Sequence, residues 1–120
     1  MSTRQALANP RQQEIARFIW IDRFNEPHNV GQMETRHLFY TVRMIWNHSA
    51  PVALRLFPYK RYTFGARYTG SYMRDAVAAM VTELNRRHPI PVEYEQDLRV
   101  MCENLRAWKA NLYVIKELTK

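Results

Sequence analysis

The sequence predicts an all-α fold, a four-helix bundle-like domain with a long C-terminal helix that organises the rest of the chain. Three observations predict it. Apolar residues recur at helical spacing in four segments. The 3 glycines are too few for the turns of a β-sandwich or a β-barrel. The 120 residues suit a single domain, residues 1–120, and 47% of them are hydrophobic, which is enough to build a core.

The C-terminal segment, residues 92–118, has the most regular pattern. Its apolar residues are spaced alternately four and three apart, the heptad period of a helix that packs one stripe against its neighbours. Acidic residues in the first turn and lysines in the last complement the helix dipole. We expect an uninterrupted helix of roughly 40 Å, because neither glycine nor proline breaks the segment. The stripe consists of Tyr94, Leu98, Met101, Leu105, Trp108, Leu112 and Ile115.

The end of this stripe has two interpretations. Trp108, Leu112 and Ile115 could protrude and form an oligomer seam with a second copy, which would make the protein a homodimer. Alternatively, the first predicted helix covers them and the protein is a monomer. We favour the second interpretation, because the first predicted helix is rich in large apolar side chains.

The first predicted helix covers residues 11–25, after a flexible polar tail at residues 1–10. It ends before Pro27, since the residue that precedes a proline disfavours helical geometry. Trp20 lies at the margin of its apolar face. That face consists of Ile15, Phe18, Ile19, Ile21 and Phe24.

The second predicted helix begins within residues 32–34 and ends near His48, and the third begins with Ser71 as its N-cap and ends before Pro89. A separate face of the second helix carries residues spaced three or four apart, namely Arg36, Tyr40, Arg43 and Asn47. The buried stripes are Leu38, Val42, Ile45 and Trp46 in the second helix, and Met73, Val77, Met80, Val81 and Leu84 in the third.

Residues 51–69 connect the second and third helices. Two runs rich in aromatic and branched residues flank Pro58 and Tyr59, a pattern that allows a short β-hairpin. A two-stranded ribbon is marginally stable unless it packs on something, so an ordered loop lying on the helices is the alternative. In either case the connection is basic and aromatic.

The charge of the chain is unevenly distributed. The formal net charge is +7, yet residues 1–34 and residues 75–120 each carry equal numbers of basic and acidic side chains. Residues 35–74 carry seven basic side chains and no acidic one, so the whole excess lies in this block. A local positive field attracts polyanions where a dispersed charge does not.

Within this block, basic residues alternate with aromatic ones from Arg55 to Arg74. Arginine and lysine neutralise phosphates, and tyrosine stacks on unpaired bases. The first hypothesis is therefore a small, basic, non-enzymatic protein that binds nucleic acid, DNA or RNA. The alternative is that the rings pack inward and the cations only confer solubility. The predicted binding residues are Arg36, Arg43, Arg55, Tyr59, Lys60, Arg61, Tyr62, Arg67, Tyr68 and Arg74.

A second hypothesis is a protein–protein interaction module, in which the same strip docks on an acidic protein surface through tyrosine and arginine anchors. Fourteen arginines against four lysines in a small basic chain are typical of phage or mobile-element proteins, so an inhibitor of a host protein is one form of this hypothesis. A third is a dimeric regulatory or structural helical protein.

Enzyme and metal chemistry lack a motif. The sequence contains no phosphate-binding loop, no nucleophile elbow and no zinc-protease motif. His37 and His48 share a helical face but are eleven residues apart, whereas metal ligands on a helix lie three or four apart. Cys102 has no histidine near it in the sequence. We expect no catalytic residue, metal or cofactor, and a cytoplasmic protein without a membrane segment.

Overall fold

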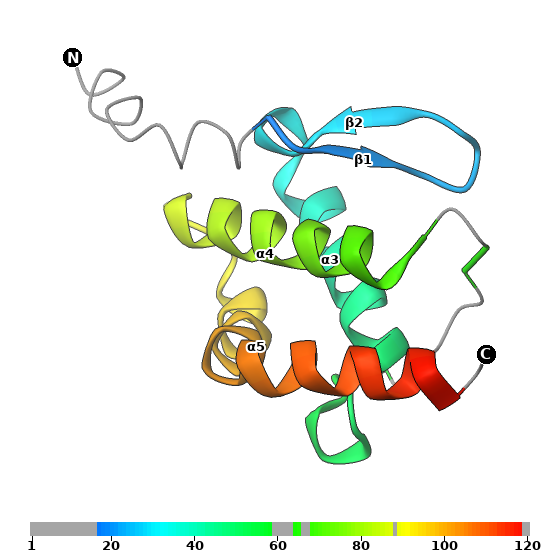
Figure 1. Ribbon diagram of the computed structural model, residues 1–120. Helices are drawn as coiled ribbons and strands as arrows, with labels where there is room; N and C mark the ends of the chain where they lie inside the picture. The colour runs from blue at the N-terminus through cyan, green and yellow to red at the C-terminus, as the bar shows by residue number, and fades with distance from the viewer. Residues whose placement is uncertain (1–16, 59–63, 66–67, 88, 119–120) are drawn as a thin grey trace.

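The computed structural model describes residues 17–58, 64–65, 68–87 and 89–118, with the backbone alone for 111–118. The described part contains three α-helices and an N-terminal two-stranded hairpin (Figure 1). The predicted mostly helical class is confirmed, and the predicted count of four helices is wrong. The elements are β1 (Ile19–Ile21), β2 (Pro27–Asn29), the 3-10 turn η1 (Val30–Gln32), α3 (Thr35–Ser49), the 3-10 turn η2 (Val52–Leu54), α4 (Gly70–Arg86) and α5 (Val92–Leu118).

The hairpin replaces the helix predicted at 11–25. Its strands pair antiparallel, with Trp20 opposite His28. Trp20, which we placed at the margin of a helix, is buried with 2% of its surface exposed, whereas Phe24, which we placed in the core, is 73% exposed. The alternation of a strand therefore buries Trp20 between its two neighbours in β1, and Phe24 is exposed because it lies in the hairpin turn. Residues 1–10, the predicted tail, and 11–16 lie outside the described residues.

Two tyrosine hydroxyls complete the outer edge of β1. The Tyr72 hydroxyl accepts a hydrogen bond from the Ile21 N–H (2.9 Å) and donates one to the Ile19 carbonyl (2.8 Å). The Tyr68 hydroxyl donates to the Ile21 carbonyl (2.8 Å). These bonds stand in for a third strand, and the ring of Trp20 packs on both tyrosine rings. A ribbon that would be marginal by itself is thus stabilised by residues about fifty positions further along the chain.

Helices α3 and α4 form the centre of the core. Both predicted stripes are buried, and Phe39 and Ala76 join them. The predicted N-cap Ser71 is wrong: Thr69 caps α4, and its hydroxyl accepts a hydrogen bond from the Tyr72 N–H (3.1 Å). In Figure 1 the hairpin lies on one side of these helices and the second half of α5 on the other.

Helix α5 is kinked, so the predicted uninterrupted helix is wrong. Asn104 has non-helical backbone angles (φ −118°, ψ 15°), and its side-chain amide donates to the Val100 carbonyl (2.8 Å). A side chain that occupies the carbonyl one turn earlier competes with the backbone ladder and bends a helix. Figure 1 shows the second half of α5 turning back across the molecule.

The kink places Trp108 inside its own molecule. Trp108 is fully buried, its ring stacks on Trp46 with centroids 5.5 Å apart, and its indole N–H donates to the Trp46 carbonyl (2.9 Å). We predicted that the first helix would cover Trp108. That prediction is wrong, because Trp46 of α3 covers it. The side chains of Leu112 and Ile115 lie outside the described ones.

The start of the 51–69 connection is an ordered loop on α3. The side chain of Asn47, 2% exposed, accepts from the Leu56 N–H (2.8 Å) and donates to the Leu56 carbonyl (2.9 Å). The indole of Trp46 donates to the Leu54 carbonyl (2.9 Å). Val52–Leu54, which the hairpin alternative placed in a strand, is a 3-10 turn instead.

A buried carboxylate joins the end of α4 to the start of α3. Glu83 is 1% exposed and forms ion pairs with Arg86 (2.6 Å) and Arg87 (2.8 Å). Arg87 also donates to the Thr35 hydroxyl (3.0 Å) and to the Val30 carbonyl (3.3 Å).

Within the described ranges, none of the helices has both the length and the hydropathy that crossing a bilayer requires.

Candidate nucleic-acid interface

One face of α3 holds a tyrosine between two arginines, of which Arg36 is exposed and Arg43 is partly buried. Arg36, Tyr40 and Arg43 are four and three residues apart, a spacing that puts them on one side of a helix. The guanidinium carbon of Arg36 lies 5.6 Å from the centroid of the Tyr40 ring, and that of Arg43 lies 4.8 Å from it. Tyr40 is 41% exposed. We call these three residues the Arg–Tyr–Arg stack, in which cation–π attraction orders two cations around a solvent-facing ring.

Aromatic packing below the stack positions the Tyr40 ring. Tyr94 of α5 stacks on Phe39 with centroids 4.1 Å apart, and its ring meets Tyr40 edge-on at 5.9 Å. Burial raises the pKa of the Tyr94 phenol above its ordinary value, so this phenol stays neutral. The neutral rings of Phe39 and Tyr94 therefore support the Arg–Tyr–Arg stack and join α3 to α5.

Arg43 also contacts two groups outside the stack. Its guanidinium donates to the Phe57 carbonyl (3.2 Å), which brings the 55–58 segment beside α3. Asp97 of α5 lies 3.7 Å from the same guanidinium. Burial raises the pKa of Asp97, and the charge of Arg43 opposes that shift. An acid from α5 thus offsets one cation of a block that has no acid of its own.

The other predicted binding residues are distributed differently. Arg55 is half-buried and donates to the Ala50 carbonyl (3.0 Å), and Arg74 pairs with its neighbour Asp75 (3.2 Å) on α4. Tyr68 is only 8% exposed, so its ring offers no open face to a base. The remaining predicted residues lie outside the described ones, namely Tyr59, Lys60, Arg61, Tyr62 and Arg67.

The structure thus brings together only part of the predicted set. Arg36 and Arg43 meet on one ring, and Arg43 contacts the segment that leads to Lys60. Tyr40 received no role from the sequence, although its spacing from the two arginines already placed it on their face. Its exposure could not be read from the sequence, because it depends on how Tyr94 packs.

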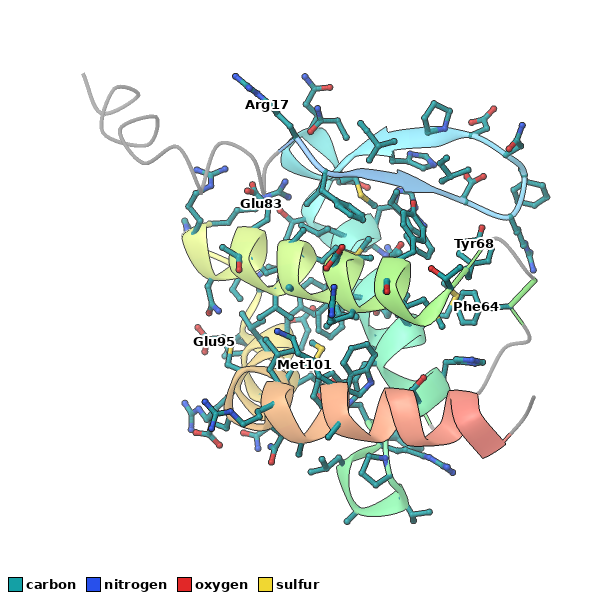
Figure 2. All side chains as sticks on the ribbon, in the orientation of Figure 1. Arg17, Phe64, Tyr68, Glu83, Glu95 and Met101 are labelled. Atoms are coloured by element: carbon teal, nitrogen blue, oxygen red, sulfur yellow. The ribbon has the colours of Figure 1, made fainter. Side chains whose placement is uncertain are left out.

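A cleft of about 460 Å³ lies between the hairpin turn, α3 and residues 64–68. We call it the hairpin cleft. On its rim, the guanidinium of Arg23 lies 5.0 Å from the centroid of the exposed Phe24 ring. Figure 2 shows Phe64 and Tyr68 close to the hairpin turn and the first turn of α4. The cleft is lined by Trp20, Asp22, Arg23, Phe24, His37, Met44, Phe64, Gly65 and Tyr68.

Asp22 organises the hairpin turn at the edge of this cleft. Its carboxylate accepts hydrogen bonds from the Phe24 N–H (2.8 Å), the Glu26 N–H (2.9 Å) and the His28 ring (2.8 Å). The bond to His28 is the main cause that holds the pKa of Asp22 below its ordinary value, and the backbone bonds add to it. The turn also contains Asn25 in the left-handed region (φ 65°).

Asp22, Glu26 and His28 are also the described residues whose ligand atoms come together closely enough, within 4.8 Å, to hold a cation. Their hydrogen bonds already account for the placement of Asp22 and His28. The two histidines that the sequence placed on one helical face contact different rings. His37 packs edge-on against His28, and His48 packs edge-on against Phe64.

Comparison with known proteins adds no relative. No protein family, no curated protein and no solved structure is detectably similar to this chain.

Proposed function

We propose that this protein binds single-stranded nucleic acid across the exposed face of α3. The observation that carries the proposal is the Arg–Tyr–Arg stack, an exposed ring held between two guanidinium groups. It lies in a forty-residue block with seven basic side chains and no acidic one.

The stack provides two kinds of contact that suit a single strand. Arg36 and Arg43 contact phosphates and release counterions. The exposed part of the Tyr40 ring, beside the two guanidinium groups, contacts an unpaired base, and a base–aromatic contact contributes about 1–3 kcal/mol. Phe57, whose carbonyl bonds to Arg43 and whose side chain is 74% exposed, provides a second ring near that arginine. Bases in a duplex are already stacked, so rings favour single strands.

The salt dependence of binding tests the proposal. The logarithm of the association constant for a short single strand should fall linearly with the logarithm of salt concentration. Arg36→Ala and Arg43→Ala should each make that slope less steep, by about one in magnitude. Arg99→Ala removes the same charge from an exposed position on α5 and should leave the slope unchanged. Affinity independent of salt, or no binding at low salt, would refute the proposal.

A gain of affinity provides a second test. Asp97→Asn removes the acid that offsets Arg43, so binding should become tighter and more salt-dependent. Glu95→Gln removes the same charge from an exposed position two residues away on α5 and serves as the matched control. If both variants bind like the unmodified protein, Arg43 does not contact phosphate.

A second candidate function is docking on an acidic protein surface, and the loop of residues 51–58, which contains η2, favours it. Val52 and Phe57 are 76% and 74% exposed, on a loop that Asn47 holds to α3 through three hydrogen bonds. A rigid apolar tip beside arginines is a suitable anchor for a groove with an acidic rim.

Affinity capture from the native host separates the two functions. A protein partner that survives nuclease treatment and is lost with Phe57→Ala favours protein docking. Loss of all retained material after nuclease treatment favours nucleic-acid binding.

A further inference from the structure

We infer that the hairpin cleft receives one unpaired nucleobase of the bound strand. The inference deepens the proposed function and rests on it, because the cleft would take a base from the strand whose phosphates contact α3.

The size and lining of the cleft fit a planar aromatic ligand. Its volume of about 460 Å³ falls within the range of about 300–1,000 Å³ that small-molecule sites occupy. Aromatic rings line its floor and its rim. Trp20 and Tyr68 are buried, Phe64 is partly buried, and Phe24 is exposed at the entrance. The rings of Phe64 and Phe24, which are not buried, provide the stacking surfaces for a base, and the buried rings of Trp20 and Tyr68 form the floor behind them.

Polar groups at the entrance match the hydrogen-bonding edge of a base. Asp22 remains ionised because its pKa is lowered, and its Oδ2, which the His28 ring contacts, has a second lone pair that can accept from a base. Arg23, whose guanidinium lies over Phe24, donates them. The lining therefore combines apolar faces with an acceptor and a donor, as small-ligand sites do.

The cleft lies on the side of α3 next to the one that carries the Arg–Tyr–Arg stack. His37 and Met44 line the cleft and follow Arg36 and Arg43 directly in α3. One residue further along a helix is a rotation of about 100°, so the two features occupy adjacent sides of one helix. A strand whose phosphates contact the arginines has a cleft beside it for one base.

Indole N–H signals in NMR spectra give a direct test. The protein has three tryptophans: Trp20 lines the cleft, whereas Trp46 and Trp108 stack on each other in the core. The probes are an oligothymidylate of about eight nucleotides, a length within the usual site size, and the same backbone without bases. The oligothymidylate should shift the Trp20 signal and leave the other two in place. The abasic strand should bind on the order of 10-fold more weakly without that shift.

A rim variant completes the test. Phe24→Ala should weaken oligothymidylate binding on the order of 10-fold and leave abasic binding unchanged. Phe24 is 73% exposed, so the variant keeps the core, and Val92→Ala, at 75% exposed on α5, is the matched control. Oligothymidylate binding that leaves the Trp20 signal in place and is unchanged by Phe24→Ala would overturn the cleft inference and leave the proposed function intact. Absence of binding by both strands at low salt would remove the proposed function and this inference together.

Discussion

Glu83 illustrates how single residues hold this small molecule together. An ionised carboxylate with 1% of its surface exposed is unfavourable unless charged partners compensate for its lost hydration. Arg86 and Arg87 provide that compensation, and Arg87 extends the network to Thr35 and Val30. One charged side chain therefore connects α4, α3 and η1.

Removing this carboxylate should be costly. Glu83→Ala should lower the free energy of unfolding by about 3 kcal/mol, because it leaves the partly buried guanidinium of Arg87 without its counter-charge. Urea denaturation would measure the loss. Glu95→Ala is the control on an exposed site, which Figure 2 shows at the outer side of α5, and should change stability little. Similar values for both variants would contradict the role of Glu83.

The hairpin turn should depend on pH through Asp22. Since the pKa of Asp22 is lowered in the folded state, its contribution is present above the ordinary aspartate pKa and is lost as the pH falls through the lowered value. Hydrogen exchange of the Glu26 amide, which bonds to Asp22, should therefore gain in protection as the pH rises from acid, after correction for intrinsic rates. Asp22→Asn should abolish this pH dependence, and a persistent dependence in that variant would assign it elsewhere.

At the scale of the elements, side chains replace backbone partners. The outer edge of β1 bonds to the hydroxyls of Tyr68 and Tyr72, and the chain after η2 bonds to Asn47. Helix α5 bends where Asn104 occupies a carbonyl of its own helix. Each of these elements is too short or too irregular to be stable alone, so its conformation depends on the side chain that contacts it.

The hairpin should weaken when one of its hydroxyls is removed. Tyr72→Phe leaves the Ile19 carbonyl and the Ile21 N–H without their partner and should cost about 1–3 kcal/mol of stability in the hairpin. Faster hydrogen exchange of the Ile21 amide would show it. Tyr68→Phe removes the bond to the Ile21 carbonyl but keeps the bond from the Ile21 N–H to Tyr72, so it should leave that amide better protected. An Ile21 amide that exchanges no faster in Tyr72→Phe would contradict this account.

The second half of α5 should detach when its anchor is removed. Trp108→Ala deletes a fully buried indole and its stacking on Trp46, which should lower the free energy of unfolding by about 3–5 kcal/mol. Chemical denaturation measures this loss. Ala107→Gly is the control for backbone effects at the neighbouring exposed position and should cost only about 1 kcal/mol.

At the scale of the whole molecule, the internal packing of Trp108 affects the oligomeric state. A seam of Trp108, Leu112 and Ile115 would lose its aromatic anchor, because that indole is sealed against α3. We therefore expect sedimentation as a monomer over about a hundredfold range of concentration, since a dimer would dissociate on dilution. A concentration-dependent dimer would contradict this expectation and would indicate that Leu112 and Ile115 form the seam.

Local periodicity predicted α3 and α4 well. Their stripes are regular, and Leu38, Val42, Met73 and Val77 are all buried as expected. The same reasoning missed the hairpin, because residues 18–21 are apolar at every position and fit a helix or a strand equally. It placed Arg36 and Arg43 on one face but could not predict Tyr40 as their exposed partner.

The sequence by itself determined the mostly helical class, the two central helices and the concentration of positive charge in residues 35–74, since spacing and charge are properties of neighbouring residues. Only the tertiary structure decided the rest. The hairpin depends on hydroxyls from Tyr68 and Tyr72, and the cover of Trp108 depends on a bend and on Trp46. The hydroxyl and indole contacts join residues 47 to 62 positions apart, and such contacts leave no periodic pattern in the chain.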